Sequence, residues 1–173
     1  RYCDDPKPQK FLKNIIEKYN ADVYAHVWFE SKGNYQISSW ALNPPDGKGI
    51  TKNPVPDNAL DIIKDVYSPQ KIKIDPPQKF ELTKRAFNFI SQKWDGPHIN
   101  EKNISNIKSQ LTSIGEVARL YEESGDEHDL YILARYDAWA VGFPELNDLP
   151  TDKFYVADHH PKFPDIIHFG GRK

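Results

Sequence analysis

Three short apolar runs in the last third of the sequence each lead directly into residues that can do chemistry. The runs lie at 129–134, 153–157 and 165–167, and each has the composition of a buried strand. The residues that follow them are, in chain order, Arg135, Asp137, Asp158, His159, His160, His168, Gly170 and Gly171. Because ligands bind at the carboxyl ends of strands in open α/β sheets, we expect these groups to form one polar, metal-capable and phosphate-binding site.

Arg135 and Asp137 are the most informative pair of this set, because they directly follow the first run. A carboxylate at a strand end can hold Mg²⁺ or Mn²⁺, and such an ion neutralises a diphosphate. The guanidinium of Arg135 can instead contact a phosphate through two parallel hydrogen bonds. The competing interpretation is a structural ion pair between the two side chains.

The second run predicts a general base or a metal ligand. Neighbouring residues on a strand point to opposite faces, so we expect Asp158 and His160 to face the same side. Imidazole titrates near neutral pH, which suits either role. The alternative is a polar turn before Pro161 with solvated histidines.

The third run ends in His168 and a glycine pair, which predicts a phosphate contact. Gly170 and Gly171 let the backbone approach a phosphate closely, and their N–H groups can donate to it. The alternative is a simple turn. The remaining histidines are predicted to be structural or to face solvent: His26, His98 and His128.

Length and composition limit the classes of protein. The 173 residues suit a single domain, 1–173, with a sizeable core. The net charge of -2 leaves no basic surplus, which argues against a nucleic-acid partner. A single cysteine, Cys3, cannot form an internal disulfide, and no apolar run is long enough to span a membrane. We therefore expect a soluble protein of a reducing compartment, the cytoplasm.

Periodicity and turn residues predict alternating helices and strands, the pattern of an α/β fold. Besides the three runs, helices are predicted at 8–19, at a short stretch after Asp57, at 80–94 and at 103–123, and strands at 21–29 and 71–75. The helix at 103–123 has an apolar stripe that includes Ile107 and Leu111, and Gly115 within it indicates close packing or a nearby ligand. Residues 30–57 are predicted to be a long loop, either a rim of the site with Trp40 exposed or a disordered insertion.

Five runs occur in a fixed order along nearly the whole chain, at 21–28, 67–72, 109–114, 131–137 and 154–170. In this order they resemble small glycosyltransferases with the GT-A fold, a group that includes the amino-terminal domain of the chlorovirus capsid glycosyltransferase. The resemblance implies a GT-A-like (Rossmann-like) central mixed β-sheet flanked by helices. It also implies transfer of a sugar from a nucleotide-diphosphate donor, with a UDP-sugar favoured, to a glycan or glycoprotein acceptor, usually with Mn²⁺ or Mg²⁺. An enzyme of this kind in a virus would serve capsid glycosylation in the host cytoplasm.

In such enzymes an acidic motif at the end of a central strand, commonly Asp-x-Asp, holds the metal against the diphosphate. Here Arg135 stands in the place of the first acid, so Asp137 is the sole matching carboxylate. The sequence His168-Phe169-x-Gly171 is similar to a His-Phe-x-Gly motif of retaining members, in which the histidine completes the metal shell and the glycine meets a phosphate.

The resemblance also implies nucleotide contacts elsewhere in the chain. The family's first strand normally precedes an arginine like Arg1, so we expect the chain to lack that strand. Phosphate or base contacts are expected from Arg1, Ser109, Arg135 and Gly170. Lys173 stands one residue before the position of the lysine that the family pattern requires.

The expected reaction uses Asp137 and His168 to hold a divalent ion that stabilises the charge on the leaving group. In an inverting reaction Asp158 or His160 would accept the proton of the acceptor hydroxyl, whereas a retaining reaction needs no such base. One alternative is a phosphoesterase of the Asp-His-His type, which residues 156–160 also resemble, although no second motif matches near the amino terminus. Another is a non-catalytic nucleotide- or glycan-binding domain, which Arg135 in the place of an acid favours.

Overall fold

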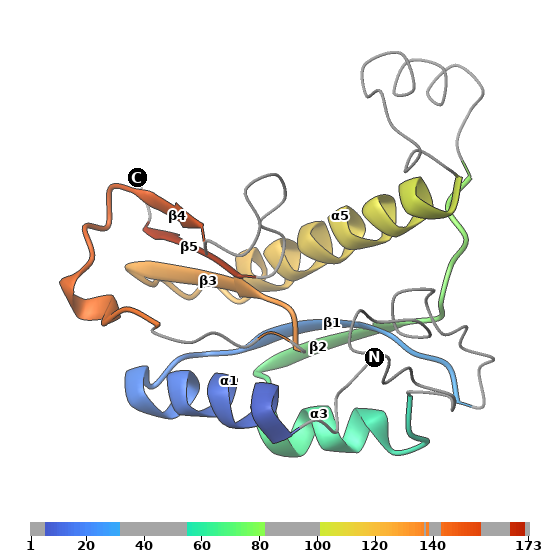
Figure 1. The fold of residues 1–173 in the computed structure, drawn as a ribbon, viewed down its shortest axis with the longest axis horizontal. Helices are drawn as coiled ribbons and strands as arrows, with labels where there is room; N and C mark the ends of the chain where they lie inside the picture. The colour runs from blue at the N-terminus through green and yellow to red at the C-terminus, as the bar shows by residue number, and fades with distance from the viewer. Residues whose placement is uncertain are drawn as a thin grey trace, which may run out of the picture. The chain divides into compact units, whose positions relative to one another are not determined.

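A computed structural model of the chain describes residues 6–31, 55–81, 101–136, 138, 143–156 and 167–171. The described residues form a mixed α/β structure (Figure 1) whose elements are α1 Pro6–Tyr19, β1 Tyr24–Trp28, α3 Ala59–Tyr67, β2 Lys71–Asp75, α5 Glu101–Glu122, β3 Leu130–Ala134, η1 Leu146–Asp148, β4 Phe154–Val156 and β5 Ile167–Gly171. The prediction of an α/β protein is therefore confirmed. The chain divides into two compact units, the first made of Arg1–Val23, Ser31–Gln70 and Asp126–Lys173 and the second of Tyr24–Glu30 and Lys71–Gly125.

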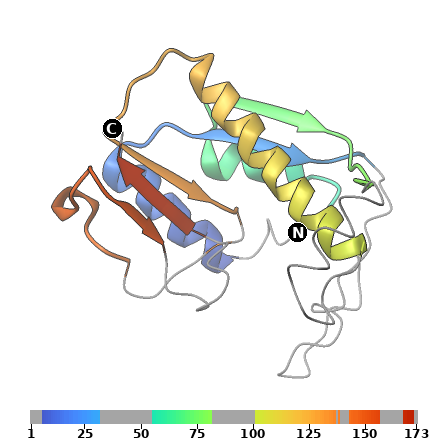
Figure 2. The same cartoon turned by 90° about the horizontal axis from the view of Figure 1, so that it is seen from above.

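The second unit is a two-stranded parallel sheet covered on one face by a long helix. β1 and β2 pair in register from Tyr24 opposite Lys71 to Trp28 opposite Asp75. α5 crosses this pair and packs on both strands (Figure 2). Because side chains alternate along a strand, His26 shares a face with every second residue of β1 and β2. That face is the one that α5 covers.

The helix predicted at 103–123 is confirmed as α5, and two residues of its apolar stripe are exposed. Ile107 is 45% exposed and Leu111 is 61% exposed. The side of the helix that contacts β1 and β2 instead carries Ser113 and Glu116, three residues apart and thus on one helical face. Polar groups occupy this face because the strand residues opposite them are also polar. Gly115 is exposed in this helix, and an added Cβ would meet no protein atom within 4 Å, so close packing is not the reason for a glycine there.

The first unit contains a three-stranded antiparallel sheet in the order β3, β5, β4. β5 pairs with β3 from Ile167 opposite Ala134 to Gly171 opposite Leu130. On its other side β5 pairs with β4, with Val156 opposite His168. The strands predicted at 129–134 and 153–157 are confirmed as β3 and β4, although residue 157 lies outside the described residues.

The third predicted strand has different bounds, because β5 begins at Ile167 instead of ending there. Gly170 and Gly171 allow the strand to continue past Ile167, because without side chains they let the backbone of residues 151 and 153 come close. A Cβ on Gly171 would collide with the backbone of Thr151, and one on Gly170 would lie 3.3 Å from the carbonyl oxygen of Lys153. The glycine pair therefore lies within the strand and not in a loop after it.

Two helices and the segment after β3 form the apolar core of the first unit. α1 and α3 contact each other, and each buries an apolar face that includes Ile15 and Ile63. Ala138 and Leu146 form the buried centre of a second cluster. The partly buried side chains packed on that centre are Phe11, Tyr19, Leu130, Ile132, Ala134, Phe143, Leu149 and Tyr155.

Several sequence predictions fall outside the described residues. These are most of the predicted helix at 80–94, of which residues 80 and 81 are described and not helical, and most of the predicted loop at 30–57 with Trp40. In the part of the chain that the structure describes, no helix combines the length and the apolar character that a membrane crossing requires.

Candidate functional site

The carboxyl ends of two strands meet the start of a third at one edge of the antiparallel sheet. β3 and β4 both run antiparallel to β5, so they run parallel to each other on its two sides. β3 ends at Ala134 opposite Ile167, and β4 ends at Val156 opposite His168. The residues that leave β3 and β4 therefore do so at the edge where β5 begins. Arg135, the first residue beyond β3, is exposed at this edge.

Several of the predicted site residues cannot be placed in this arrangement. Arg1, Asp137, Asp158 and His160 lie outside the described residues, and of His168 only the backbone is described. In the sequence, however, Asp137 follows the end of β3 by three residues, and Asp158 follows the end of β4 by two. Their roles as metal ligand and general base remain predictions.

The segment after β3 is held on both sides of Asp137 in the sequence. The amide of Ala138 donates a hydrogen bond of 2.9 Å to the carbonyl oxygen of Arg135, which closes a turn. The hydroxyl of Tyr67, at the end of α3, donates a hydrogen bond of 3.0 Å to the carbonyl oxygen of Tyr136. Tyr67 is 6% exposed and Ala138 is 1% exposed. The residues before and after Asp137 are thus anchored in the interior of the first unit.

A second set of contacts ties residues 143–146 to α1. The ammonium of Lys18 lies 2.5 Å from both carboxylate oxygens of Glu145. The hydroxyl of Tyr19 donates to Glu145 at 3.1 Å and accepts from the amide of Leu146 at 3.1 Å. The hydrogen bond from Lys18 lowers the pKa of Glu145 below its ordinary value, and the bond from Tyr19 adds to this. Phe143 meets the edge of the Phe11 ring at a centroid distance of 5.4 Å.

The glycine pair lies away from the edge where β3 and β4 end. Gly170 pairs with Tyr131 on one side and Phe154 on the other, three positions along β5 from Ile167. At a rise of about 3.4 Å per residue, this places it roughly 10 Å along the strand from that edge. The close approach of neighbouring backbone supplies a structural reason for both glycines, and their phosphate contact remains a prediction.

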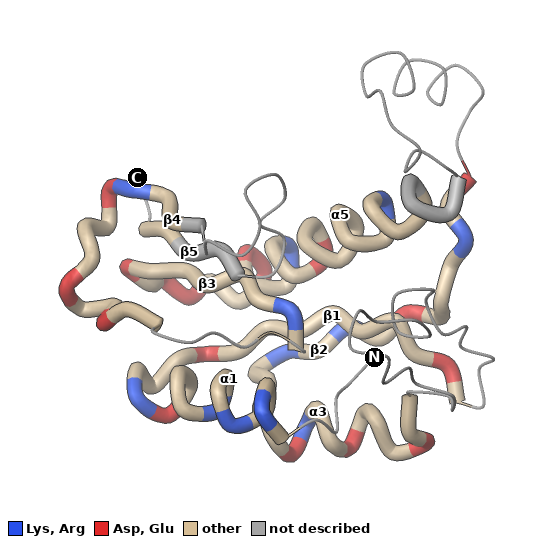
Figure 3. The backbone as a smooth tube through the Cα atoms, viewed as in Figure 1, with Lys and Arg blue, Asp and Glu red and all other residues tan. Residues whose placement is uncertain are grey.

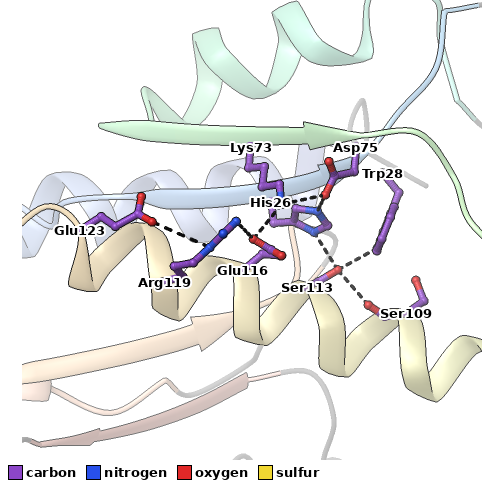
Figure 4. A network of polar contacts seen from close by, with 9 residues as sticks. All are labelled: His26, Trp28, Lys73, Asp75, Ser109, Ser113, Glu116, Arg119 and Glu123. Carbon is purple, nitrogen blue, oxygen red and sulfur yellow. Dashed lines mark hydrogen bonds and ion pairs between the residues drawn. The ribbon is translucent and has the colours of Figure 1, made fainter.

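The second unit holds a network of polar side chains that the sequence analysis did not identify (Figure 4). His26 was predicted to be structural or solvent-facing, and its side chain is 0% exposed. Its Nδ1 lies 3.0 Å from the hydroxyl oxygen of Ser113, and its Nε2 lies 3.0 Å from a carboxylate oxygen of Asp75. A serine, a histidine and an aspartate are therefore joined in a row.

Charged side chains continue this row along the interface between β2 and α5. Lys73 lies 3.3 Å from the Asp75 carboxylate and 2.9 Å from that of Glu116, which also pairs with Arg119. The hydrogen bond from His26 lowers the pKa of Asp75, and the hydrogen bond from Lys73 lowers that of Glu116. The hydrogen bond to Glu116 raises the pKa of Lys73. Figure 3 shows acidic and basic residues alternating along α5, as this pairing requires.

The row of Ser113, His26 and Asp75 resembles a nucleophile activated by a base, but its hydrogen bonds argue against that chemistry. The Ser113 oxygen also accepts a hydrogen bond of 2.8 Å from the indole N–H of Trp28. Its third polar partner, besides His26 and Trp28, is the carbonyl oxygen of Ser109 at 3.0 Å. One covalent bond and three polar partners fill the tetrahedral directions around this oxygen. These contacts join α5 to β1 through the Ser113 oxygen, which supports a structural role for it.

A pattern in the sequence carries a signal for this network. His26 and Trp28 are two residues apart in β1, and Lys73 and Asp75 are two residues apart in β2, so each pair lies on one face of its strand. Polar residues at alternate positions indicate a polar face. Recognising the network also requires the pairing of β1 with β2 and the side on which α5 packs, which no local pattern contains.

Ser109, the predicted nucleotide contact, belongs to the second unit. Its carbonyl oxygen accepts the hydrogen bond from Ser113. The other predicted contacts that the structure describes, Arg135, Gly170 and Gly171, belong to the first unit. The predicted nucleotide contacts are therefore divided between the two units.

No group of three or more His, Cys, Asp and Glu side chains that could hold a metal ion occurs within the described ranges. The predicted metal ligands, Asp137 and the side chain of His168, are outside those ranges. A comparison of the chain with protein-family models, with curated proteins and with solved structures finds no match in any of the three.

Proposed function

We propose that the chain is a glycosyltransferase that moves a sugar from a nucleotide-diphosphate donor, with a UDP-sugar favoured, to a glycan or glycoprotein acceptor. The proposal includes a divalent ion, Mn²⁺ or Mg²⁺, and the GT-A-like form of the α/β fold. It starts from the order of the sequence runs and from the chemistry of the residues that follow β3 and β4.

One observation supports this proposal most directly: the residues on either side of Asp137 in the sequence, Tyr136 and Ala138, are held by hydrogen bonds shortly after the end of β3. The turn from Arg135 to Ala138 and the hydrogen bond from Tyr67 hold the neighbours of Asp137. A metal-ligating side chain whose backbone neighbours are already held loses little conformational freedom when the metal binds, which favours metal affinity. The carboxyl ends of β3 and β4 meet the start of β5 at this edge, which suits a site built from several strand ends.

In the proposed reaction the chain binds and orients the donor diphosphate. A carboxylate and an imidazole, Asp137 and His168, are a donor set that suits Mn²⁺ and, less well, Mg²⁺. The ion would neutralise charge that grows on the leaving diphosphate. Arg135, exposed at the edge, and Arg1 would add positive potential toward the same oxygens.

The residues after β4 are proposed to accept the proton of the acceptor hydroxyl. In an inverting reaction Asp158 or His160 would accept this proton as the new glycosidic bond forms. In a retaining reaction neither residue would be needed as a base. The stereochemistry of the product, read by NMR, separates these two outcomes.

Calorimetric titration of UDP and GDP with and without Mn²⁺ tests the proposal. We expect UDP to bind much more tightly with Mn²⁺, and we expect Asp137→Ala to lose at least about tenfold in that metal-dependent affinity. Asp152→Ala removes an exposed carboxylate from the same unit and serves as the control. Failure of both nucleotides to bind the wild-type protein in either condition would contradict the proposal.

Two further assays separate the alternatives. Release of UDP from a UDP-sugar, dependent on the metal, supports a transferase. Binding of nucleotide with no metal effect and no release of UDP indicates a non-catalytic binding domain. Hydrolysis of a phosphodiester with Mn²⁺, without turnover of any sugar nucleotide, indicates the phosphoesterase.

A further inference from the structure

The interior of the second unit contains an imidazole whose two nitrogens face groups of different hydrogen-bonding capacity. The His26 side chain has no exposed surface, so its hydrogen bonds must come from the protein. Nε2 faces the carboxylate of Asp75, and Nδ1 faces the hydroxyl of Ser113. A carboxylate can only accept hydrogen bonds when ionised, whereas a hydroxyl can both donate and accept.

The partners of Asp75 fix the proton on Nε2. The hydrogen bond from His26, and secondarily that from Lys73, lowers the pKa of Asp75, so this carboxylate is ionised at neutral pH. An ionised carboxylate beside a bare nitrogen would place two acceptors 3.0 Å apart. His26 therefore carries a proton on Nε2 in every arrangement that satisfies both groups.

The remaining choice concerns the single proton of Ser113. Trp28 can only donate, so the Ser113 oxygen accepts from the indole N–H at all times. In a neutral arrangement the Ser113 hydroxyl donates to Nδ1 of His26. In a charged arrangement Nδ1 carries an added proton and donates to Ser113, and the Ser113 hydroxyl donates to the carbonyl oxygen of Ser109.

Both arrangements use the same heavy-atom positions. The Ser109 carbonyl lies within α5 and is also the helical partner of the amide four residues later, so it needs no second donor in the neutral arrangement. The 3.0 Å contact between Nδ1 and Ser113 fits donation in either direction, and the 3.0 Å distance to the Ser109 carbonyl oxygen fits the hydrogen bond that Ser113 donates in the charged arrangement. Only a rotation of the Ser113 hydroxyl separates the two states.

Charged side chains of β2 and α5 lie around the contacts of His26. From β2 these are Asp75 and Lys73, with Lys71 on the same face of the strand, and from α5 they are Glu116 and Arg119, with Glu123 paired to Arg119. The Asp75 carboxylate contacts His26 directly and would pair with an imidazolium. On β1 the neighbouring titratable group is Tyr24, whose hydroxyl donates to Ser124.

We propose that His26 and Ser113 form a proton-linked hydrogen-bond switch between β1 and α5. A proton from solvent binds Nδ1, Ser113 keeps its own proton and turns it toward Ser109, and the hydrogen bond between sheet and helix reverses direction. The charged form is the stronger of the two, because its donor is a cation. Uptake of this proton therefore tightens the contact between α5 and β1.

Nitrogen-15 NMR of the imidazole rings tests the switch in the full chain. The signals of His26 are assigned as those that His26→Gln removes. At alkaline pH we expect the proton on Nε2 alone. As the pH falls, the Nδ1 resonance should move to its protonated position while that of Nε2 changes little. A proton on Nδ1 alone at alkaline pH, or an Nδ1 that stays bare until the unit unfolds, overturns the proposal.

Ser113→Ala tests the part played by the hydroxyl. Without the oxygen, a protonated Nδ1 would be a buried cationic donor with no partner, which costs more than a neutral nitrogen with none. We expect Nδ1 of this variant to take up its proton only at lower pH than in the wild type, and Ser113→Thr to restore the wild-type behaviour. Uptake at the same pH in Ser113→Ala would show that Ser113 has no part in the switch.

Discussion

The hydroxyl of Tyr67 donates a hydrogen bond of 3.0 Å to the carbonyl oxygen of Tyr136, the residue that precedes Asp137. Sixty-nine positions separate the two tyrosines, so the end of α3 supports the segment that leaves β3. Tyr67 is 6% exposed, so its side chain is held by packing as well as by this hydrogen bond. In the proposed glycosyltransferase Tyr67 would position Asp137 without contacting the donor.

Tyr67→Phe should weaken metal-dependent UDP binding while the fold is retained. The change removes only the hydroxyl, leaves the Tyr136 carbonyl without this donor, and should lower the free energy of unfolding by about 1 kcal/mol. Calorimetry with UDP and Mn²⁺ measures the binding, and a urea titration measures the stability.

Tyr155→Phe is the matched control for this change. Tyr155, which is partly buried, also donates from its hydroxyl to a backbone carbonyl, that of Pro150, at 3.0 Å, but this hydrogen bond is exposed. We expect wild-type UDP affinity from it. Equal affinity in Tyr67→Phe and the wild type would remove the positioning role of Tyr67 and leave the proposed function itself standing.

Alanine at two glycines should change the stability in opposite directions. Gly171→Ala places a Cβ against the backbone of Thr151, and relief of that collision should cost about 1–3 kcal/mol. Gly115→Ala adds a methyl group to an exposed helical position with no protein atom within 4 Å, and should stabilise by roughly 0.5–1 kcal/mol. Urea titrations of the two variants check both signs, and destabilisation by Gly115→Ala would contradict the described course of α5.

Leu146→Ala should be among the more destabilising changes in the first unit. Leu146 is buried at the centre of a cluster with Ala138, and truncating a buried leucine costs about 2–5 kcal/mol. Leu111→Ala is the control, because its exposed side chain loses little contact with the protein. Thermal and urea unfolding compare the two, and similar losses would mean that the packing around Leu146 differs from that described.

The stability of the second unit should fall in acid. The folded-state pKa values of Asp75 and Glu116 lie below their ordinary values because of His26 and Lys73 respectively. Their contribution is therefore fully present above the ordinary carboxyl range, near pH 4, and is lost as the pH falls through the lower folded-state values.

Glu116→Gln tests this pH dependence because it removes one of the two titrating carboxylates. We expect the variant to have a lower urea midpoint than the wild type at neutral pH, and a smaller further decrease in the range below about pH 4. Lys73 has a raised pKa, so its charge persists throughout this range. The same decrease with acid in the variant and the wild type would contradict the role of Glu116.

Local sequence patterns predicted most of the described elements well. The strand at 71–75 has the predicted bounds, and the helices predicted at 8–19 and 103–123 correspond to Pro6–Tyr19 and Glu101–Glu122. Such elements are readable because periodicity and chain-breaking residues act within a few positions. The third terminal strand was the exception, because pairing with strands on both sides extends it through residues that would otherwise favour a turn.

The sequence by itself determined the α/β class, the order of the elements and the residues that follow β3 and β4. Only the tertiary structure decided that β5 lies between those strands, that Tyr67 supports the segment after β3, and that the side chain of His26 has no exposed surface. The Nδ1 of His26 meets a serine 87 positions away, and its Nε2 meets an aspartate 49 positions away. Such contacts depend on strand pairing and on the side where a helix packs, and the free energy that selects them is shared among residues that no short stretch of sequence brings together.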